Sequence, residues 1–165
     1  MLNIAPTASF ANTSGAIIKG QSAALAFGNQ FDPSTADVAA GFRYSYDCAN
    51  DGTFELSDAA ATSHACAYPV SGIFTARGRI KDKDGGFTDY QQTVTVNSVA
   101  PTATIGNSGP VNEGSNVTVS LTSPVEPASA DTTAGLRYFF STVQATRDAA
   151  TYASSSTSNS ASIAT

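Results

Sequence analysis

Side chains that could carry out catalysis are scarce in this chain of 165 residues, which has one histidine, two cysteines and no tryptophan. A Ser-His-Asp or Cys-His mechanism would have to use His64, because the nucleophile needs a neighbouring base. His64 follows Thr62 and Ser63 on an expected strand, without the glycine-flanked serine of a nucleophile elbow. We therefore expect His64 to lie at the surface or rim of the fold, and we predict that the protein is not an enzyme.

The two cysteines favour a disulfide. Cys48 and Cys66 both fall on the buried parity of expected strands, so their side chains can meet inside a sandwich. An even cysteine count in a chain of extracellular appearance favours a disulfide, which would stabilise the fold by roughly 3 kcal/mol. The spacing is not that of a Cys-x-x-C metal or redox motif. Two free buried thiols are the alternative.

An acidic loop is the candidate metal site. Asp47, Asp51 and Asp58 would hold the first, fifth and twelfth positions of a calcium loop, with Gly52 at its sharp turn. Ala49 stands at the third position, and calcium takes about six to eight oxygen ligands, so backbone or water would have to supply the remainder. The sequence leaves open a calcium site or a hairpin with solvated carboxylates, and it indicates no other cofactor.

A basic stripe is the candidate ligand face. Its members share the outward parity of two strands that should be neighbours, and they are Arg43, Arg77, Arg79 and Lys81. Such a stripe could contact an acidic polysaccharide or a partner domain, but no aromatic residues alternate with it for stacking on sugars or bases. A solvated outer face with cross-strand partners such as Asp89 is the alternative.

Composition excludes several classes of partner. The formal net charge is −5, the isoelectric point is about 4.5 and only 13% of residues are charged, which disfavours binding to nucleic acid or an anionic membrane. No apolar run reaches the roughly 18 residues that would span a bilayer. The first ten residues lack the basic start and apolar stretch of a signal peptide, so we expect any targeting signal to lie outside this chain.

The elements that position these residues are predicted to be strands. Apolar residues keep one parity, with a period of two, along five segments: 8–10, 23–27, 42–46, 74–80 and 90–96. Turn residues separate them, among them Asp32-Pro33-Ser34, Asp51-Gly52 and Asp84-Gly85-Gly86. No stretch of ten or more residues carries a helical stripe. The pattern predicts an all-β sandwich.

The chain also contains an internal repeat. Ala5-Pro6-Thr7-Ala8 returns 95 residues later as Ala100-Pro101-Thr102-Ala103. Further matches follow at an offset of 94 residues: Gly20 with Gly114, Pro33 with Pro127, Ala36-Asp37 with Ala130-Asp131, and Arg43-Tyr44 with Arg137-Tyr138. The ordered series predicts a tandem duplication, with one complete sandwich in residues 1–97 and a second copy in 98–165.

The second copy is predicted to be incomplete. Aligning Thr62-Ser63-His64 with Thr157-Ser158-Asn159 leaves no counterparts for segments 73–82 and 87–97, the last two strands of the unit. A sandwich without them exposes apolar faces and strand edges. A truncated fragment, strands donated by a neighbouring chain, and an aberrant but self-contained fold are the three interpretations.

The run Gly72–Gly86, GIFTARGRIKDKDGG, followed by Thr93-Val94-Thr95-Val96, resembles the last two strands of PKD domains, in which a G-x-Y-T-V strand leads into D-x-D-G-G and a terminal T-V-x-V strand. The resemblance implies an immunoglobulin-like β-sandwich of the kind repeated in tandem in large bacterial surface and secreted proteins. The W-x-F-G-D-G motif of many members is replaced here by Tyr44-Ser45-Tyr46-Asp47.

Together these observations predict a non-catalytic extracellular or cell-surface module that acts as a spacer, display or adhesion repeat of a larger bacterial protein. Its partners would be neighbouring repeats of the same chain and an extracellular polysaccharide or protein. We expect no nucleic-acid partner and no membrane insertion. The alternatives are a carbohydrate- or protein-binding accessory module of a secreted hydrolase and a self-assembling subunit that exchanges strands.

Overall fold

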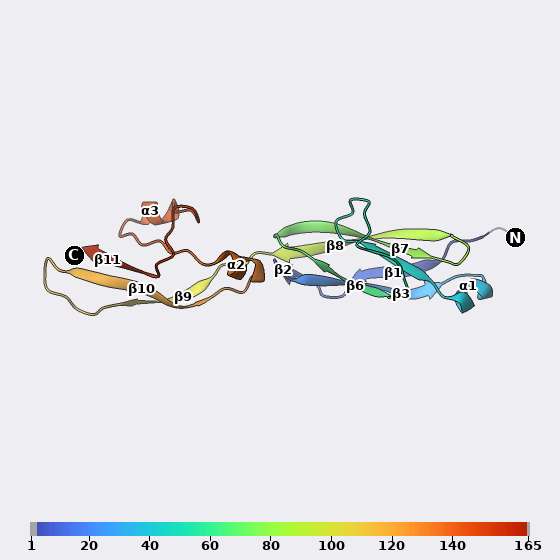
Figure 1. Cartoon of the computed structure of the whole chain (residues 1–165), viewed down its shortest axis with the longest axis horizontal. Coiled ribbons are helices and arrows are strands. Elements are labelled where there is room, and N and C mark those ends of the chain that lie inside the picture. Colours follow the sequence, from blue (N-terminus) through green and yellow to red (C-terminus); the bar gives the residue numbers. More distant parts are fainter. Residues whose placement is uncertain (1–2, 165) are drawn as a thin grey trace. The chain divides into compact units, whose positions relative to one another are not determined.

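The computed structural model describes residues 3–164 (Figure 1). The chain divides after Ser98 into two compact units, which are described separately below. Among the described residues, no helix is both long enough and apolar enough to cross a membrane. Strands dominate both units, and the predicted all-β class is confirmed.

The first unit is a sandwich of two sheets. One sheet has the order β1-β3-β6, formed by β1 (Thr7–Asn12), β3 (Ser22–Phe31) and β6 (Ser63–Ala67). The other has the order β2-β8-β7-β4-β5, formed by β2 (Ile17–Ile18), β8 (Phe87–Asn97), β7 (Gly72–Lys81), β4 (Arg43–Asp47) and β5 (Leu56–Ala59). Adjacent strands are antiparallel except for β2, which runs parallel to β8.

The core lies between these sheets and follows the predicted alternation. Successive residues of a strand point to opposite faces, so one residue in two reaches the interior. The buried apolar residues include Ala23, Leu25, Phe27, Tyr44, Tyr46, Ala76, Ile80, Val94 and Val96. Aromatic rings fill its centre, where the Phe27 ring lies 4.7 Å from that of Phe10 and 5.6 Å from that of Tyr46.

A short helix was not predicted. Residues 32–34 were expected to form only a turn, but α1 (Thr35–Ala40) follows them. Its N-terminus is capped by Ser34, whose hydroxyl accepts a hydrogen bond from the Asp37 N–H at 3.3 Å. Gly41, with a φ of 77°, ends it. Six residues are too few to carry a periodic stripe, so the pattern analysis could not detect this helix.

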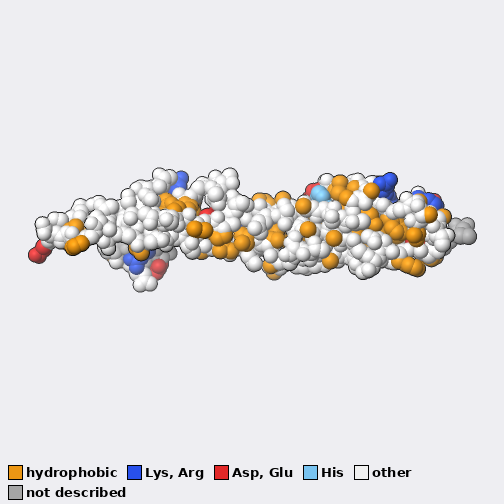
Figure 2. All heavy atoms as spheres, turned by 90° about the horizontal axis from the view of Figure 1, so that it is seen from below, with side chains coloured by type: hydrophobic (Ala, Val, Ile, Leu, Met, Phe, Trp, Pro, Cys, Tyr) orange, Lys and Arg blue, Asp and Glu red, His pale blue; other side chains and the backbone are white. Residues whose placement is uncertain are grey.

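The second unit has a single sheet within its described residues. The order is β11-β10-β9, formed by β9 (Thr102–Asn107), β10 (Asn116–Val125) and β11 (Ser160–Ala164). Two short helices complete it, α2 (Ser129–Ala134) and α3 (Gln144–Asp148). Ala128 is the one residue of the described part of this unit that is buried. Figure 2 shows hydrophobic side chains at the surface of both units, and Ile105 in β9 is 71% exposed.

Gly78 is required by the close approach of the two sheets. A Cβ atom at this position would lie 2.6 Å from Cε2 of Phe10 and 2.7 Å from Cζ of Phe27. We expect Gly78→Ala to lower the free energy of unfolding by about 1–3 kcal/mol, because the core cannot take the extra methyl group without moving rings. Urea denaturation followed by tyrosine fluorescence measures this.

The control is Thr75→Val, an exposed change on the same strand, which should alter stability by less than about 0.5 kcal/mol. Equal stabilities of Gly78→Ala and the wild type would contradict the packing argument.

Candidate functional site

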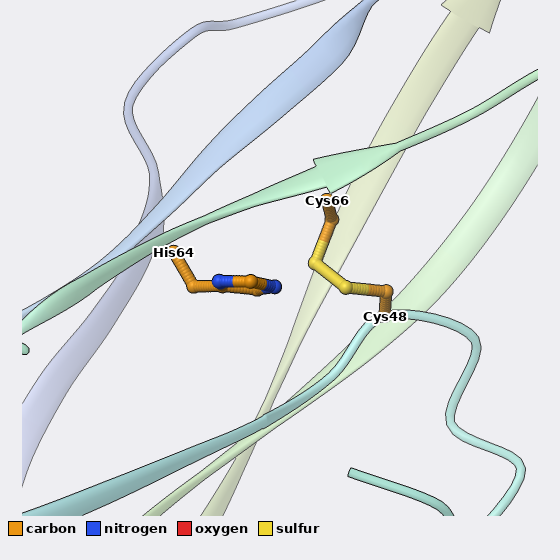
Figure 3. Close-up of side chains that lie close together, drawn as sticks. All are labelled: Cys48, His64 and Cys66. Carbon is orange, nitrogen blue, oxygen red and sulfur yellow. A yellow bond between two sulfur atoms is a disulfide. The ribbon is translucent and has the colours of Figure 1, made fainter. Parts of the chain in front are cut away.

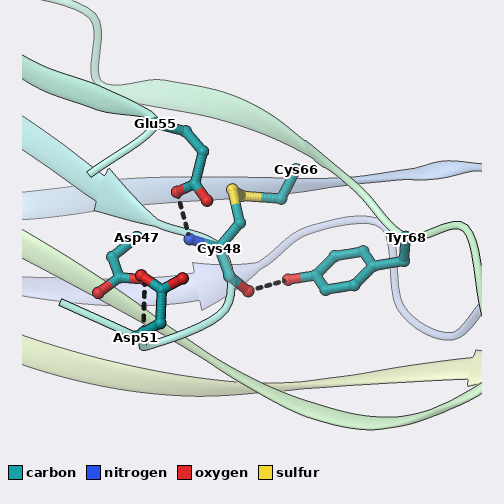
Figure 4. Close-up of a disulfide and its surroundings, with 6 residues drawn as sticks. All are labelled: Asp47, Cys48, Asp51, Glu55, Cys66 and Tyr68. Carbon is teal, nitrogen blue, oxygen red and sulfur yellow. Dashed lines mark hydrogen bonds between the residues drawn. A yellow bond between two sulfur atoms is a disulfide. The ribbon is translucent and has the colours of Figure 1, made fainter. Parts of the chain in front are cut away.

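The predicted disulfide between Cys48 and Cys66 is confirmed. Their Cα atoms lie 5.5 Å apart, and the bond joins the end of β4 in one sheet to β6 in the other. Figure 4 shows its surroundings: Glu55 accepts a hydrogen bond from the Cys48 N–H at 2.7 Å, and the Tyr68 hydroxyl donates to the Cys48 carbonyl at 2.9 Å. Burial raises the pKa of Tyr68, so this hydroxyl remains a donor at neutral pH.

His64 extends from β6 toward the disulfide (Figure 3). Its ring is half-buried and lies 5.5 Å from that of Tyr46. One nitrogen of His64 and the sulfurs of Cys48 and Cys66 lie within 4.8 Å of one another. Both sulfurs are bonded to each other, so they are not the thiolates that zinc would need. The arrangement is therefore structural packing around a covalent link.

The acidic loop predicted to bind calcium has protein partners at its first and last positions. Asp47 is fully buried, and its carboxylate accepts hydrogen bonds from the backbone N–H groups of Asp51 and Gly52 at 3.1 and 2.9 Å. Asp58 pairs with Lys81 at 2.6 Å. Calcium at Asp47, Asp51 and Asp58 stays a prediction, and these contacts place the carboxylates in hairpin and ion-pair roles.

The basic stripe lies on the outer face of the five-stranded sheet, on the neighbouring strands β4 and β7. Arg43 is exposed and stands opposite Lys81 in the strand register. Carboxylates pair with the other three cations: Arg77 with Asp47 at 3.0 Å, Arg79 with Asp89 at 2.7 Å, and Lys81 with Asp58 at 2.6 Å. Most of the stripe's charge is therefore balanced within the unit. The alternative prediction, a solvated outer face with cross-strand partners, names Asp89 as one of these partners.

Two aromatic residues that the sequence analysis overlooked belong to this face. The guanidinium of Arg79 lies 3.7 Å from the centre of the Phe87 ring, and that of Arg77 lies 4.8 Å from the centre of the Phe54 ring. These are cation–π distances. Phe54 comes from the loop before β5 and Phe87 begins β8, so neither alternates with the arginines along one strand.

A second group of acidic residues lies at one end of the first unit, and we call it the carboxylate pocket. Its members are Asp32, Asp37 and Asp82, which are 4%, 2% and 3% exposed. Asp32 directly follows β3, Asp37 is on α1 and Asp82 directly follows β7. One carboxylate oxygen from each lies within 4.8 Å of the others. In the sequence, Asp32 belongs to the predicted turn Asp32-Pro33-Ser34, and Asp82 stands just before the predicted turn Asp84-Gly85-Gly86.

Asp82 is the best-satisfied member of the pocket. Its Oδ1 accepts hydrogen bonds from the backbone N–H groups of Asp84 and Gly86 at 2.9 and 2.8 Å. Its Oδ2 accepts one from the Asn3 amide at 3.1 Å, which ties the segment before β1 to the turn between β7 and β8. A Cβ atom at position 86 would lie 2.5 Å from Asp82 Oδ2, so glycine keeps this carboxylate in place.

Asp32 has an unsatisfied oxygen. Its Oδ1 accepts a hydrogen bond from the Ser34 N–H at 2.8 Å, whereas its Oδ2 is buried without a hydrogen-bond partner. A buried carboxylate oxygen without a donor is costly, and neighbouring carboxylates increase that cost. Hydrogen bonds from Lys83 and Ser34 hold the pKa of Asp37 below its ordinary value, so this group is ionised at neutral pH. The pocket therefore presents buried negative charge and a free oxygen.

The comparisons with known proteins give little detail. No protein-family profile and no curated protein matches the chain. One solved structure, described as a carbohydrate-binding module of the β-sandwich superfamily, aligns with 73% of this chain at a TM-score of 0.49 and 16% identity. The aligned region spans 59% of that structure's own chain.

The pair formed by Arg79 and Asp89 gives a pH-dependent prediction. The Arg79 guanidinium holds the pKa of Asp89 below its ordinary value. The pair should therefore stabilise the fold above the unfolded pKa of about 3.9 and lose this effect as the pH falls through the lowered folded pKa. We expect Asp89→Asn to lower the free energy of unfolding by about 0.5 kcal/mol at pH 7, with no difference from the wild type at the acid limit.

Urea denaturation between pH 2 and pH 7 measures this difference, and the cycle with Arg79→Gln isolates the pair from other effects. A difference that persisted unchanged at low pH would show that Asp89 acts through packing instead of charge.

Proposed function

We propose that this chain is a non-catalytic extracellular module, built from PKD-like, immunoglobulin-like repeats, in which calcium at the carboxylate pocket stiffens the first repeat. Such a module would act as a spacer or display repeat of a larger bacterial surface or secreted protein, with neighbouring repeats as its partners. The unpartnered buried oxygen of Asp32, beside Asp37 and Asp82, carries the proposal. The Cys48–Cys66 disulfide supports an oxidising, extracellular location.

The donors of the pocket suit calcium better than other common cations. All three side chains offer carboxylate oxygens, which hard cations prefer, whereas zinc favours nitrogen and sulfur. Magnesium keeps several waters in near-octahedral geometry, which a pocket of nearly inaccessible carboxylates does not favour. The amide of Asn3 can add a further oxygen by turning over, since its nitrogen already lies 3.1 Å from Asp82.

A cation in this pocket would fasten three separate parts of the first unit. Asp32 stands at the end of β3, Asp37 on α1 and Asp82 at the start of the β7–β8 turn. Through Asn3, Asp82 also holds the segment that leads into β1. Neutralising the carboxylates would therefore fix the end of the sandwich at which the chain enters. A spacer gains from this because the angle between successive repeats depends on the stiffness of such ends.

Matching structural elements support the tandem duplication. The strands β3 and β10 each have ten residues, β1 and β9 each have six, and α1 and α2 each have six. The two helices end alike, at Gly41 and Gly135, whose φ angles are 77° and 81°. Each of these glycines donates its N–H to the carbonyls three and four residues earlier. Equivalent sequence positions thus adopt equivalent local structures.

Strand pairing revises one part of the predicted alignment. In the first unit His64 pairs with Leu25, and in the second Ala161 pairs with Val119, the residue 94 positions after Leu25. Under the proposed duplication, Ala161 and not Asn159 is therefore the counterpart of His64. By the same register Ile163 is the counterpart of Cys66, whereas the predicted match of 62–64 with 157–159, an offset of 95 residues, puts Ala161 opposite Cys66. The loop before β11 is two residues longer than the alignment allowed.

The outer face supports a second candidate function, binding of a polysaccharide by an accessory module. Phe87 is 48% exposed, and its ring is held in place by the Arg79 guanidinium, which suits stacking against a sugar ring. The paired carboxylates leave little net charge there for an acidic ligand. A neutral glycan is therefore the better match, and loss of glycan-array signal on Phe87→Ala, with retention on Phe31→Ala, would favour this function.

The calcium proposal predicts opposite effects of Asp32→Asn in the absence and presence of the ion. In EDTA the variant should match or exceed the wild type in melting temperature, because one buried charge is removed. Calcium at a hundredfold excess over its Kd should stabilise the wild type by about 2.7 kcal/mol and leave the variant unchanged. Differential scanning calorimetry and isothermal titration with calcium chloride measure both effects.

Asp58→Asn is the matched control, because it removes an exposed carboxylate of the acidic loop and should keep the calcium response. A wild-type protein that neither bound calcium nor changed its melting temperature would refute the proposed stiffening role. Loss of the response in Asp58→Asn alone would place the ion in the loop instead.

A further inference from the structure

Lys83 lies at the mouth of the carboxylate pocket. Its Nζ is 2.9 Å from Oδ1 of Asp37 and 2.5 Å from Oδ2 of Asp84. The two carboxylates differ in environment, since the side chain of Asp37 is 3% exposed and that of Asp84 is 52% exposed. The ammonium therefore bridges a buried anion of the pocket and a solvated anion outside it.

The charge of the pocket explains why an ammonium is held there. Asp32, Asp37 and Asp82 concentrate negative charge in a volume from which water is largely excluded. Lys83 forms an ion pair with Asp37, one of the three carboxylates. The carboxylates of Asp84 and Asp37 raise the pKa of Lys83, so it is charged at any physiological pH.

The Lys83 ammonium can also move away from Asp37. The Lys83 side chain is 41% exposed, and lysine stems are flexible, so the Nζ atom can move outward while it remains beside Asp84. Withdrawal would give a second carboxylate oxygen of the pocket, Oδ1 of Asp37, to an incoming ion alongside the unpartnered Oδ2 of Asp32. A divalent cation and a retained ammonium cannot share Oδ1 of Asp37 without repulsion between the two cations.

We propose that Lys83 is a tethered competitor that occupies the mouth of the carboxylate pocket and must be displaced from Asp37 when a divalent cation binds. This inference rests on the proposed calcium function and adds that Lys83 controls the affinity of the carboxylate pocket for calcium. Displacement costs the same free energy whichever ion enters. Lys83 therefore sets the concentration at which the pocket fills and leaves the preference for calcium over magnesium unchanged. A weakened site fits extracellular modules, whose calcium Kd values are about 0.1–1 mM.

The test compares Lys83→Met with Lys81→Met in calcium titrations of the full chain. Both variants remove one positive charge from neighbouring positions, but Lys81 pairs with Asp58 outside the pocket. We expect Lys83→Met to bind calcium about three to ten times more tightly than the wild type, and Lys81→Met to stay within about twofold. Lys83→Met should also melt at a lower temperature in EDTA and show the larger rise on adding calcium.

The outcomes separate this inference from the function on which it rests. Equal affinities of Lys83→Met and Lys81→Met, with a wild type that binds calcium, would overturn the competitor role and leave the calcium site standing. No calcium binding by any of the three proteins would overturn both. A changed ratio of calcium to magnesium affinity in Lys83→Met would also contradict the inference, because a simple competitor affects both ions equally.

Discussion

The contact between the two sheets of the first unit is the constraint on which every site depends. At its centre the rings of Phe10 and Phe27 pack against the backbone of β7 at Gly78, where even a methyl group would not fit. This fixes the spacing of the sheets and hence the positions of their ends. The carboxylate pocket uses the end of β3 from one sheet and the end of β7 from the other. Its geometry is therefore a product of core packing.

The acidic residues of the sandwich have two kinds of environment: some pair with cations, and others are grouped with further carboxylates. On the outer face, carboxylates are shared with cations across strands, as with Asp89 and Arg79, and the charges are close to balanced. At the end of the sandwich, Asp32 and Asp82 are brought together without an equal number of cations. Backbone N–H groups satisfy most of Asp82, but nothing satisfies Oδ2 of Asp32. The first arrangement is complete in itself, whereas the second leaves Oδ2 of Asp32 without a hydrogen-bond partner.

Much of the fold could be predicted from the sequence, because the strands of the first unit bury one face. Alternation placed Leu25, Tyr46 and Ile80 in the core, and parity brought Cys48 within reach of Cys66. The pocket could not be predicted in this way. Two of its members, Asp32 and Asp82, directly follow strands, where aspartate has a local role in capping N–H groups, and local reasoning stops at that role. Only the stacking of the two sheets, one with β3 and the other with β7, brings Asp32 and Asp82 together at one end of the sandwich.

The alignment of the second unit shows the same limit on a smaller scale. The predicted match of residues 157–159 with 62–64 does not use the strand register, and under the proposed duplication the pairing of β11 with β10 moves this match two residues further along. Hydrophobic parity alone cannot detect a shift of two, because a shift of two returns every side chain to the same face. The hydrogen bonds between β10 and β11 determine the register of the two strands.

For the proposed spacer role, the disulfide has a mechanical consequence. Cys48 and Cys66 are 18 residues apart in the chain, and their Cα atoms are 5.5 Å apart in the fold. When a stretching force unfolds the first unit, the disulfide carries the force directly from Cys48 to Cys66. The residues between the two cysteines therefore do not extend, which shortens the unfolded chain by roughly 60 Å. A filament built from such units would lengthen less at each rupture and would recoil over a shorter path when the load is removed.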